Sequence, residues 1–334
     1  ADPSTLSMAG DLAESWDVAE DGSSYTFHLR DNAKWHDGEP VTANDVAYTY
    51  TMALNPDTSS KLVGRLSLIA GATEYSDKTA ETVSGIEVVD DQTVTFTMAF
   101  PNGLFLNETI LPILPEHILG EIAPAELGTN AFFTSEPVGS GPFTFVEYRA
   151  DQYVEVAANP DYHFGAPAIS TIVYNIIESP DTVQVALSRG EIDYPSFDGG
   201  TAQKSLYEFA LGDDRYRVDG TQGSAVVGYG WNYRDETLVD PRIHQAFLYA
   251  IDRPSLVAAF NSNNGSIFNS FMTHSWYQKP EWAELYPYDP DQAKALLEEA
   301  GWDSSRTVNV NVITLANEDI RSMLAAEQQM LAEA

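Results

Sequence analysis

The sequence predicts an α/β protein with more than one domain, and three observations carry that prediction. The chain has 334 residues, which is longer than most single domains. Hydrophobic residues make up 43% and aromatic residues 11%, as in a protein that buries a real core. Within residues 170–194, a strand pattern, a capped helix, a glycine and an extended segment follow one another, which is the order of an α/β unit.

The opening third predicts strands and one clear helix. In residues 23–30 (SSYTFHLR) apolar and polar side chains alternate, which predicts a strand with one apolar face. Residues 41–56 (VTANDVAYTYTMALNP) have helical spacing of apolar residues, with Thr42 as N-cap and Asp45 in a variant of the capping box. Residues 86–100 (IEVVDDQTVTFTMAF) predict a hairpin around their Asp-Asp pair.

The middle third adds strands and a second helix. Residues 137–148 (PVGSGPFTFVEY) end in a strand pattern that we expect to pair with residues 152–159 (QYVEVAAN). Residues 170–177 (STIVYNII) predict a strand with a nearly continuous apolar run. A helix follows, with Ser179 as N-cap and a proline at its first position, and it ends at Gly190.

The last third begins with an aromatic and glycine-rich segment, residues 226–233, which predicts a strand. Helices are predicted after the caps Asp240 and Asp289 and near Pro254, and strict alternation in residues 307–315 predicts another strand. The closing segment predicts a helix with one face made of Ile320, Met323, Leu324, Glu327 and Leu331.

The charge balance makes nucleic acid a poor partner. The chain carries 50 acidic and 17 basic residues, a formal net charge of -33, whereas phosphate binding needs a basic face. The acidic residues are spread along the whole chain. This favours a solvated surface that suits a salty medium over a field that draws cationic ligands into a cleft.

The absence of cysteine limits the possible chemistry but does not decide the compartment. No cysteine is present, which excludes disulfides, thiolate nucleophiles and cysteine-ligated metals. No apolar run approaches the roughly 18 residues of a membrane span. The opening ADPSTLSMAGDLAESW lacks the regions of a signal peptide, and the last helix stops at Ala334 without a cap. Either the protein is not exported, or this is not its true beginning, and the unfinished unit at the end indicates a truncated chain.

The pair His36-Asp37, in RDNAKWHDGEPVTANDV, has the residue types of an active site. A catalytic histidine needs a nucleophile within reach and a third group that orients it, and adjacency to an aspartate supplies neither. The Asp-Gly step between a strand and a capped helix is instead typical of a turn. The sequence therefore predicts a structural role for this pair.

Other catalytic and metal-binding patterns are also missing. There is no G-x-S-x-G elbow, no H-E-x-x-H and no P-loop, and the glycines at 139–142 precede a strand rather than a helix. The six histidines are far apart and lack ligand spacing. A pair of glycosidase carboxylates stays open, because so many acids make any chosen pair uninformative. No catalytic residue, metal site or cofactor is predicted.

One binding signal remains. Tyr229, Trp231, Asn232 and Tyr233 cluster in a glycine-interrupted segment at the junction of two halves of the chain. Aromatic walls with a few amide groups suit a cleft that holds an extended polar ligand. Ordinary core aromatics are an equally good interpretation, because alternation sends only half of these side chains to any one side.

Several blocks of the sequence resemble one known family. Residues 12–50 (LAESWDVAEDGSSYTFHLRDNAKWHDGEPVTANDVAYTY) are similar to the signature block of family 5 extracellular solute-binding proteins, the oligopeptide, dipeptide and nickel receptors of ABC importers. The resemblance continues, in the family's order, through residues 139–177, 188–194 (SRGEIDY), 231–257 and 286–302. An ordered series is a stronger signal than any single motif.

The resemblance implies a fold and a division of the chain. The fold would be periplasmic-binding-protein-like, type II, with two lobes that enclose a ligand and are joined by crossing strands. Residues 1–12 and 138–236 would form lobe one, residues 13–137 an inserted α/β subdomain, and residues 237–334 the first part of lobe two. Residues that bind the ends of a peptide in the family would lie mostly beyond this chain.

The resemblance also implies a function. A receptor of this family delivers di- or oligopeptides to ABC permease subunits by hinge closure, is not an enzyme, and lies in the periplasm or outside the cell, in some members as a lipoprotein. We expect a monomer. Asn232 and its neighbours match the strand that lines the cleft of peptide receptors, so Tyr229, Trp231 and Asn232 are the predicted ligand-binding residues. Oligosaccharides, opines and a nickel chelate stay open as ligands, and a polymer hydrolase is the rival class.

Overall fold

A computed structural model of the chain describes most of its residues. The described residues are 8–195, 204–218, 228, 230–261, 265–270, 279–282, 285–308 and 318–334. The chain divides into two compact units, Ala1–Ile177 and Glu178–Ala334. The predicted division into two lobes and an inserted subdomain stays a prediction.

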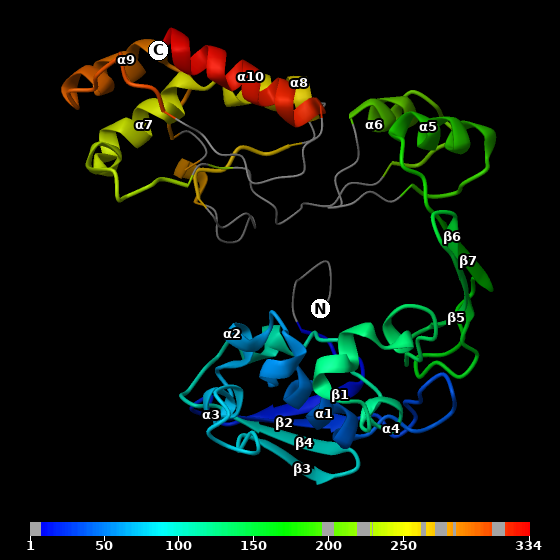
Figure 1. Ribbon diagram of the computed structural model, residues 1–334. Helices are drawn as coiled ribbons and strands as arrows, with labels where there is room; N and C mark the ends of the chain where they lie inside the picture. Colours follow the sequence, from blue (N-terminus) through cyan, green and yellow to red (C-terminus); the bar gives the residue numbers. More distant parts are fainter. Residues whose placement is uncertain are drawn as a thin grey trace. The chain divides into compact units, whose positions relative to one another are not determined.

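A four-stranded antiparallel sheet forms the centre of the first unit (Figure 1). Its strands are β1 (Ala13–Val18), β2 (Ser24–Leu29), β3 (Ile86–Asp90) and β4 (Thr93–Thr97), in the order β1-β2-β4-β3. In β2 the alternating Tyr25, Phe27 and Leu29 are buried, as predicted. β3 and β4 form the predicted hairpin.

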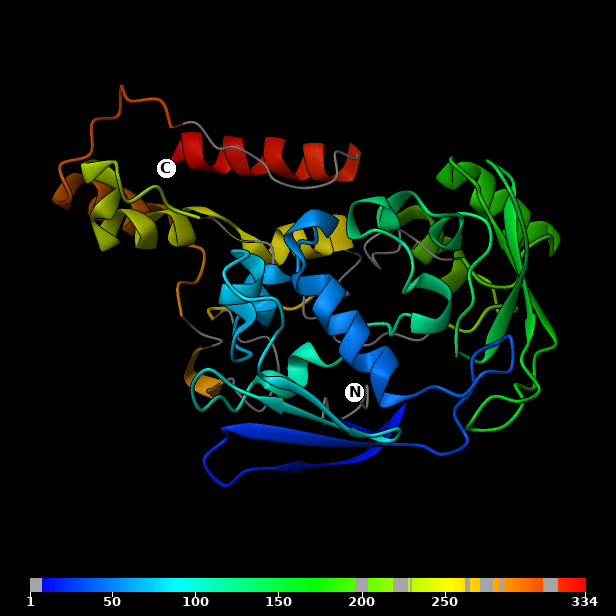
Figure 2. The ribbon, with the colours of Figure 1, turned by 60° about the horizontal axis from the view of Figure 1, so that its bottom comes forward.

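Helix α1 (Ala43–Leu54) packs against β3 and β4 and covers one face of this sheet, as Figure 2 shows. Tyr50 of α1 and Phe96 of β4 meet with ring centroids 4.8 Å apart, and Phe105 lies 5.2 Å from Phe96. Short helices complete the layer: α2 (Val63–Leu66), α3 (Ala72–Ser76) and α4 (Glu116–Leu119). The alternating apolar face of the strands thus supplies one side of the core, and the helical stripe of α1 supplies the other.

Asp45 anchors the start of α1 and is only 4% exposed. One carboxylate oxygen accepts hydrogen bonds from Thr42 N (2.8 Å), Thr42 Oγ1 (3.1 Å) and Trp35 Nε1 (3.4 Å), and the other accepts from Glu116 N (2.8 Å). The predicted capping box is therefore present. Burial, and then the negative charge of Asp45, raises the pKa of Glu116.

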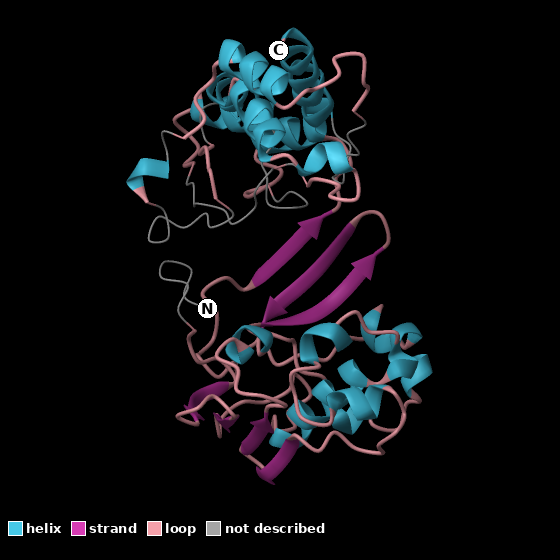
Figure 3. Cartoon of the chain, turned by 90° about the vertical axis from the view of Figure 1, so that its left-hand side faces the viewer, coloured by secondary structure: helices cyan, strands magenta, loops and turns pink. Residues whose placement is uncertain are grey.

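A second sheet of the first unit is a three-stranded antiparallel meander, seen in Figure 3 as three adjacent magenta arrows. It comprises β5 (Phe143–Arg149), β6 (Tyr153–Ala158) and β7 (Thr171–Asn175). The pairing of β5 with β6 follows the sequence prediction. An irregularity between Phe145 and Glu147 shifts the register by one residue, so that Phe145 and Tyr148 share a face.

The second unit is helical in its described residues. Helices α5 (Pro180–Arg189) and α6 (Lys204–Leu211) pack together, α7 (Pro241–Ala250) packs on α9 (Pro290–Glu299), and α10 (Glu318–Glu333) contacts α7 and α8 (Arg253–Asn261), as Figure 1 shows. The caps predicted from sequence hold α7 and α9: Asp240 accepts from Arg242 N (2.9 Å) and Asp289 from Gln292 N (2.9 Å).

Two strand predictions differ from the structure. Residues 191–195 carry no strand, because the chain turns at Gly190 (φ 70°) and Glu191 N bonds back to Ala186 O at 2.9 Å, which closes α5. Residues 230–233 carry no strand either. The rest of the segment 226–233 apart from Gly228, and residues 309–315 of the strand predicted near the end, lie outside the described residues.

Candidate ligand-binding site

Trp231 lies against one face of α7. Its ring stacks on His244 with centroids 4.3 Å apart and planes at 18°, and it meets Phe247 edge-on at 4.9 Å. His244 and Phe247 are three residues apart in α7, so they point to the same side of the helix. The indole is half-buried beside Leu238 and Ile243. Trp231 is therefore held in one orientation by the helix that Asp240 caps.

His244 is fixed in turn by the backbone. Its Nε2 lies 2.6 Å from Leu238 O, and because a carbonyl can only accept, Nε2 carries the hydrogen. Tyr233 approaches the same imidazole edge-on at 5.8 Å and is 63% exposed. The imidazole thus contacts two aromatic rings from the segment before α7. Sequence reasoning missed His244, because it lies 13 residues beyond Trp231 and only the turn between them brings the rings together.

Asn232 is exposed and shapes the turn. Its Oδ1 accepts from Arg234 N at 3.2 Å, and its backbone carbonyl accepts from Asp235 N at 3.0 Å. Such a local side-chain bond competes with strand pairing, which explains why residues 230–233 are a turn-forming loop. Among the described residues the side-chain amide nitrogen of Asn232 has no hydrogen-bond partner. Tyr229, the third predicted site residue, lies outside the described residues.

The electrostatics beside this cluster are set by Asp240. Side-chain and backbone hydrogen bonds from Arg242 lower the pKa of Asp240 to about 2. Arg242 also donates to Glu299 O at the end of α9 (2.8 Å). The carboxylate is thus ionised and paired, so the aromatic cluster lies next to a compensated charge.

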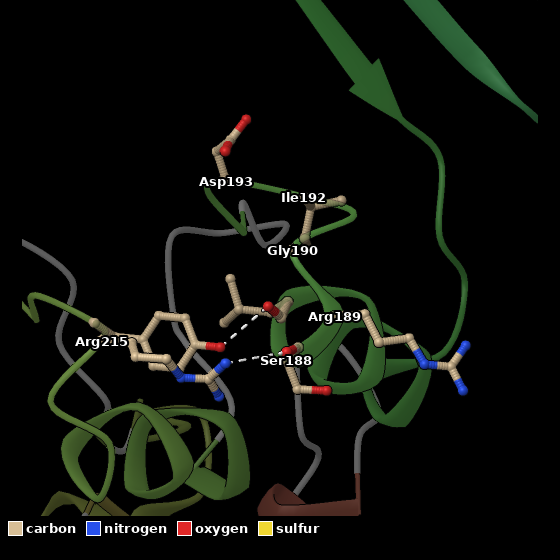
Figure 4. A pocket seen from close by; sticks show the side chains of 8 residues that line it. Ser188, Arg189, Gly190, Ile192, Asp193 and Arg215 are labelled. Atoms are coloured by element: carbon tan, nitrogen blue, oxygen red, sulfur yellow. Dashed lines mark hydrogen bonds between the residues drawn. The ribbon is translucent and has the colours of Figure 1, made fainter.

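A pocket of about 360 Å³ lies elsewhere in the second unit, at the C-terminal end of α5 (Figure 4). It is lined by Leu187, Ser188, Arg189, Gly190, Ile192, Asp193, Arg215 and Tyr216. Arg215 donates to Ser188 O (3.3 Å) and forms an ion pair with Asp213 (2.6 Å), so its charge is compensated. None of the predicted site residues lines this pocket, although five of its residues lie in the block 188–194 (SRGEIDY) that resembles the family.

The pair His36-Asp37 forms a turn, as predicted. Gly38 has φ 98° and donates its N–H to Trp35 O at 2.9 Å. The imidazole of His36 bonds to backbone atoms of Gly139 and Gly141, and Asp37 pairs with His117 at 2.8 Å.

Within the described part of the chain, no group of three His, Asp or Glu side chains is arranged to bind a metal ion. None of the described helices combines the length and the hydropathy that a membrane span needs.

Comparison with known proteins agrees with the resemblance. The family model of bacterial extracellular solute-binding proteins, family 5 Middle, matches residues 7–334. A Brucella ovis protein named for ABC-transporter peptide binding is 35% identical over 331 residues, which cover 98% of this chain and 58% of that protein.

Two solved structures resemble the chain. The oligopeptide-binding protein AppA from Bacillus subtilis, in complex with a nonapeptide, has a TM-score of 0.71 and 25% identity and covers 97% of this chain and 63% of its own. NikZ from Campylobacter jejuni, in complex with Ni(L-His), has a TM-score of 0.68 and 27% identity and covers 87% of this chain and 54% of its own. The chain thus spans between 54% and 63% of these proteins.

These likenesses confirm the predicted type II binding-protein fold, with its mixture of helices and sheets. The match over residues 7–334 leads to one conclusion: the chain belongs to the bacterial extracellular solute-binding proteins of family 5.

Proposed function

We propose that the chain is part of an extracellular or periplasmic receptor that captures peptides and delivers them to the permease subunits of an ABC importer. The observation that carries this proposal is the likeness to AppA, which was solved with a nonapeptide, across 97% of this chain. The Brucella ovis relative, named for the same kind of binding, supports it. Attachment as a lipoprotein, a monomeric state and the absence of nucleic-acid binding are parts of the same proposal.

The mechanism we propose is hinge closure without bond breaking. A ligand that contacts the closed state better than the open state shifts the population toward closure, and the gain equals the difference in affinity. The permease then recognises the closed form. In this proposal the receptor only binds and releases the solute, and no step of its cycle is catalytic.

The ligand contacts we propose are Tyr229, Trp231 and Asn232, of which the structure describes the last two. The stack on His244 holds the indole rigid, so a ligand that meets it loses little side-chain entropy on binding. The exposed amide of Asn232 has N–H groups that can donate to a peptide carbonyl. Aromatic faces and a single amide also suit a sugar or a chelate, so the ligand must be identified by measurement.

Calorimetry tests the function on the protein as its gene encodes it. We expect stoichiometric binding of di- to nonapeptides and unchanged peptides after prolonged incubation. Binding of Ni(L-His) with no binding of peptides would move the ligand class to metal chelates and leave the receptor role in place, as the likeness to NikZ permits. Multiple turnover of a peptide or a glycoside would overturn the proposal.

Substitutions test the site. Asn232→Ala should weaken peptide binding by about fivefold, the effect of one net hydrogen bond of about 1 kcal/mol. Trp231→Ala should weaken it by about tenfold or more, because a rigid aromatic contact is lost. The matched controls are Asn175→Ala, an exposed asparagine at the end of β7, and Trp16→Ala in β1. Equal affinities for the site variants and the controls would show that the assignment is wrong.

A further inference from the structure

The turn at residues 35–39 is fastened to the loop at residues 139–141 by one histidine. His36 N donates to Gly139 O (2.8 Å), Gly139 N donates to Nδ1 of His36 (3.2 Å), and Nε2 of His36 lies 3.0 Å from Gly141 O. A Cβ at Gly139 would lie 3.2 Å from Cε1 of His36, so the approach is close enough to favour glycine. We name this three-bond contact of His36 with Gly139 and Gly141 the His36 clasp.

The clasp requires a neutral imidazole of one tautomer. Gly139 N–H is a donor, so Nδ1 must offer its lone pair, and Gly141 O is an acceptor, so Nε2 must carry the hydrogen. A proton bound at Nδ1 would remove the acceptor and place two N–H groups against each other. The third bond, between the backbone of His36 and Gly139 O, does not depend on the imidazole.

The clasp joins two parts of the first unit that are far apart in sequence. The turn with His36 follows β2 and precedes α1, whereas Gly141 lies two residues before β5. Gly141 O also accepts from Nδ2 of Asn159 (3.1 Å), and Asn159 N donates to Pro142 O (2.8 Å). Asn159 is 6% exposed and follows β6 directly. The imidazole is therefore bonded to the loop from which the β5–β7 sheet begins.

We propose that the His36 clasp is a proton-sensitive fastening between the turn at residues 35–39 and the base of the β5–β7 sheet, closed when His36 is neutral and open when a proton from solvent occupies Nδ1. It lies wholly within the first unit, and its test is independent of ligand binding. The contacts of His28 and His117 respond in the opposite sense, because these residues pair with the carboxylates of Asp17 and Asp37 at 3.0 and 2.8 Å, and a protonated imidazole strengthens such a pair. His163 also pairs with a carboxylate, that of Asp11 at 2.9 Å, but its Nδ1 is buried with no hydrogen-bond partner among the described residues, so a proton there would lack an acceptor.

Several ionisable groups belong to the segments that meet at the clasp or lie next to them in the chain. They are Lys34, Asp37 and Glu39 of the turn, Glu116 and His117 of α4, and Asp161 after β6. Among the described residues none of these side chains hydrogen-bonds to the imidazole of His36. Burial raises the pKa of Asp37, but the hydrogen bonds from His117 and from the backbone of Glu39 together outweigh it, so the pKa lies below its usual value.

Hydrogen exchange at Gly139 tests the proposal in the intact protein. After correction for intrinsic rates, the protection of this amide should fall by about fivefold between about pH 8 and about pH 5, as expected for one net hydrogen bond in the range where histidine titrates. In His36→Asn, the asparagine Oδ1 can accept from Gly139 N–H and cannot titrate. The protection of the Gly139 amide in this variant should therefore not change with pH. The control His28→Asn keeps the clasp and should behave as the natural protein does.

A second measurement needs no variant. Nitrogen NMR of ¹⁵N-labelled histidine should show His36 with its hydrogen on Nε2 near pH 8, and its protonation should coincide with the loss of protection at Gly139. Two results would overturn the proposal. One is an equal pH dependence of Gly139 exchange in His36→Asn and in the natural protein. The other is unchanged protection while His36 takes up its proton.

Discussion

Replacing Asp45 with alanine should destabilise the first unit more than any other single charge removal that the structure suggests. The carboxylate is 4% exposed and accepts from the backbone of Thr42 and Glu116 and from the indole of Trp35. Alanine would leave three N–H donors without an acceptor, at about 1–3 kcal/mol for each buried donor. Partial access of water lowers that sum, so we expect a loss of about 3–5 kcal/mol in the free energy of unfolding.

Asp45→Asn removes the charge at the start of α1 but keeps a side-chain oxygen that can cap the helix. One amide oxygen can keep the bonds to Thr42 and Trp35, but the amide nitrogen then faces the N–H of Glu116, so the loss should be smaller, about 1–3 kcal/mol. The control is Asp57→Ala, which removes an exposed carboxylate paired with Lys78 and should cost less than about 1 kcal/mol.

The assay is urea unfolding read out by hydrogen exchange of the α1 amides, residues 43–54, because this readout reports the first unit alone. Of the three variants, Asp57→Ala should be the most stable, Asp45→Asn should be intermediate, and Asp45→Ala should be the least stable. A loss below about 1 kcal/mol for Asp45→Ala, or no difference from Asp57→Ala, would refute the idea that a buried carboxylate anchors α1.

Three further outcomes are expected. Gly85→Ala should destabilise the protein by about 1–3 kcal/mol in urea unfolding, because the new Cβ would lie 2.5 Å from Thr97 O. At Gly64 the space for a Cβ is open, so Gly64→Ala should stabilise the protein by about 0.4–1 kcal/mol. The pKa of Asp240 is lowered to about 2. Its ionised form therefore stabilises the folded protein above the usual pKa of an aspartate, and this contribution is lost as the pH falls through about 2. The difference in melting temperature between the natural protein and Asp240→Asn should be constant above about pH 5 and should shrink below about pH 4. The protein carries a net charge of -33, and raising the salt concentration from about 0.1 M to about 1 M shortens the screening length from about 10 Å to about 3 Å. The repulsion between the acidic residues should then weaken, so the melting temperature should rise. A flat response would contradict the interpretation of the acidic surface.

Local signals predicted the elements whose ends are set by neighbouring residues. Thr42 and Asp45 marked the start of α1, Asp240 and Asp289 marked α7 and α9, and Gly190 marked the end of α5. Each of these signals is a bond between groups at most four residues apart, so it is readable from sequence.

The strand predicted at residues 226–233 was wrong for the four described residues 230–233, and the reason is also local. Aromatic and glycine residues favour a strand there, but the side chain of Asn232 bonds to Arg234 N and turns the chain toward α7. The prediction weighed β-propensity and overlooked this competing bond. The signal that could have revealed it was Asn232 itself, because an asparagine side chain can bond to the backbone two residues further on and so favours a turn.

The sequence by itself determined the α/β class, the capped ends of α1, α5, α7 and α9, the turn at His36-Asp37 and, through an ordered series of blocks, the family. Only the tertiary structure decided that Asp45 bonds to Glu116, that Trp231 stacks on His244, and that His36 bonds to Gly139 and Gly141. These contacts join residues between 13 and 105 positions apart. Their partners are chosen by how elements pack in three dimensions, and the spacing of residues along the chain carries no record of that choice.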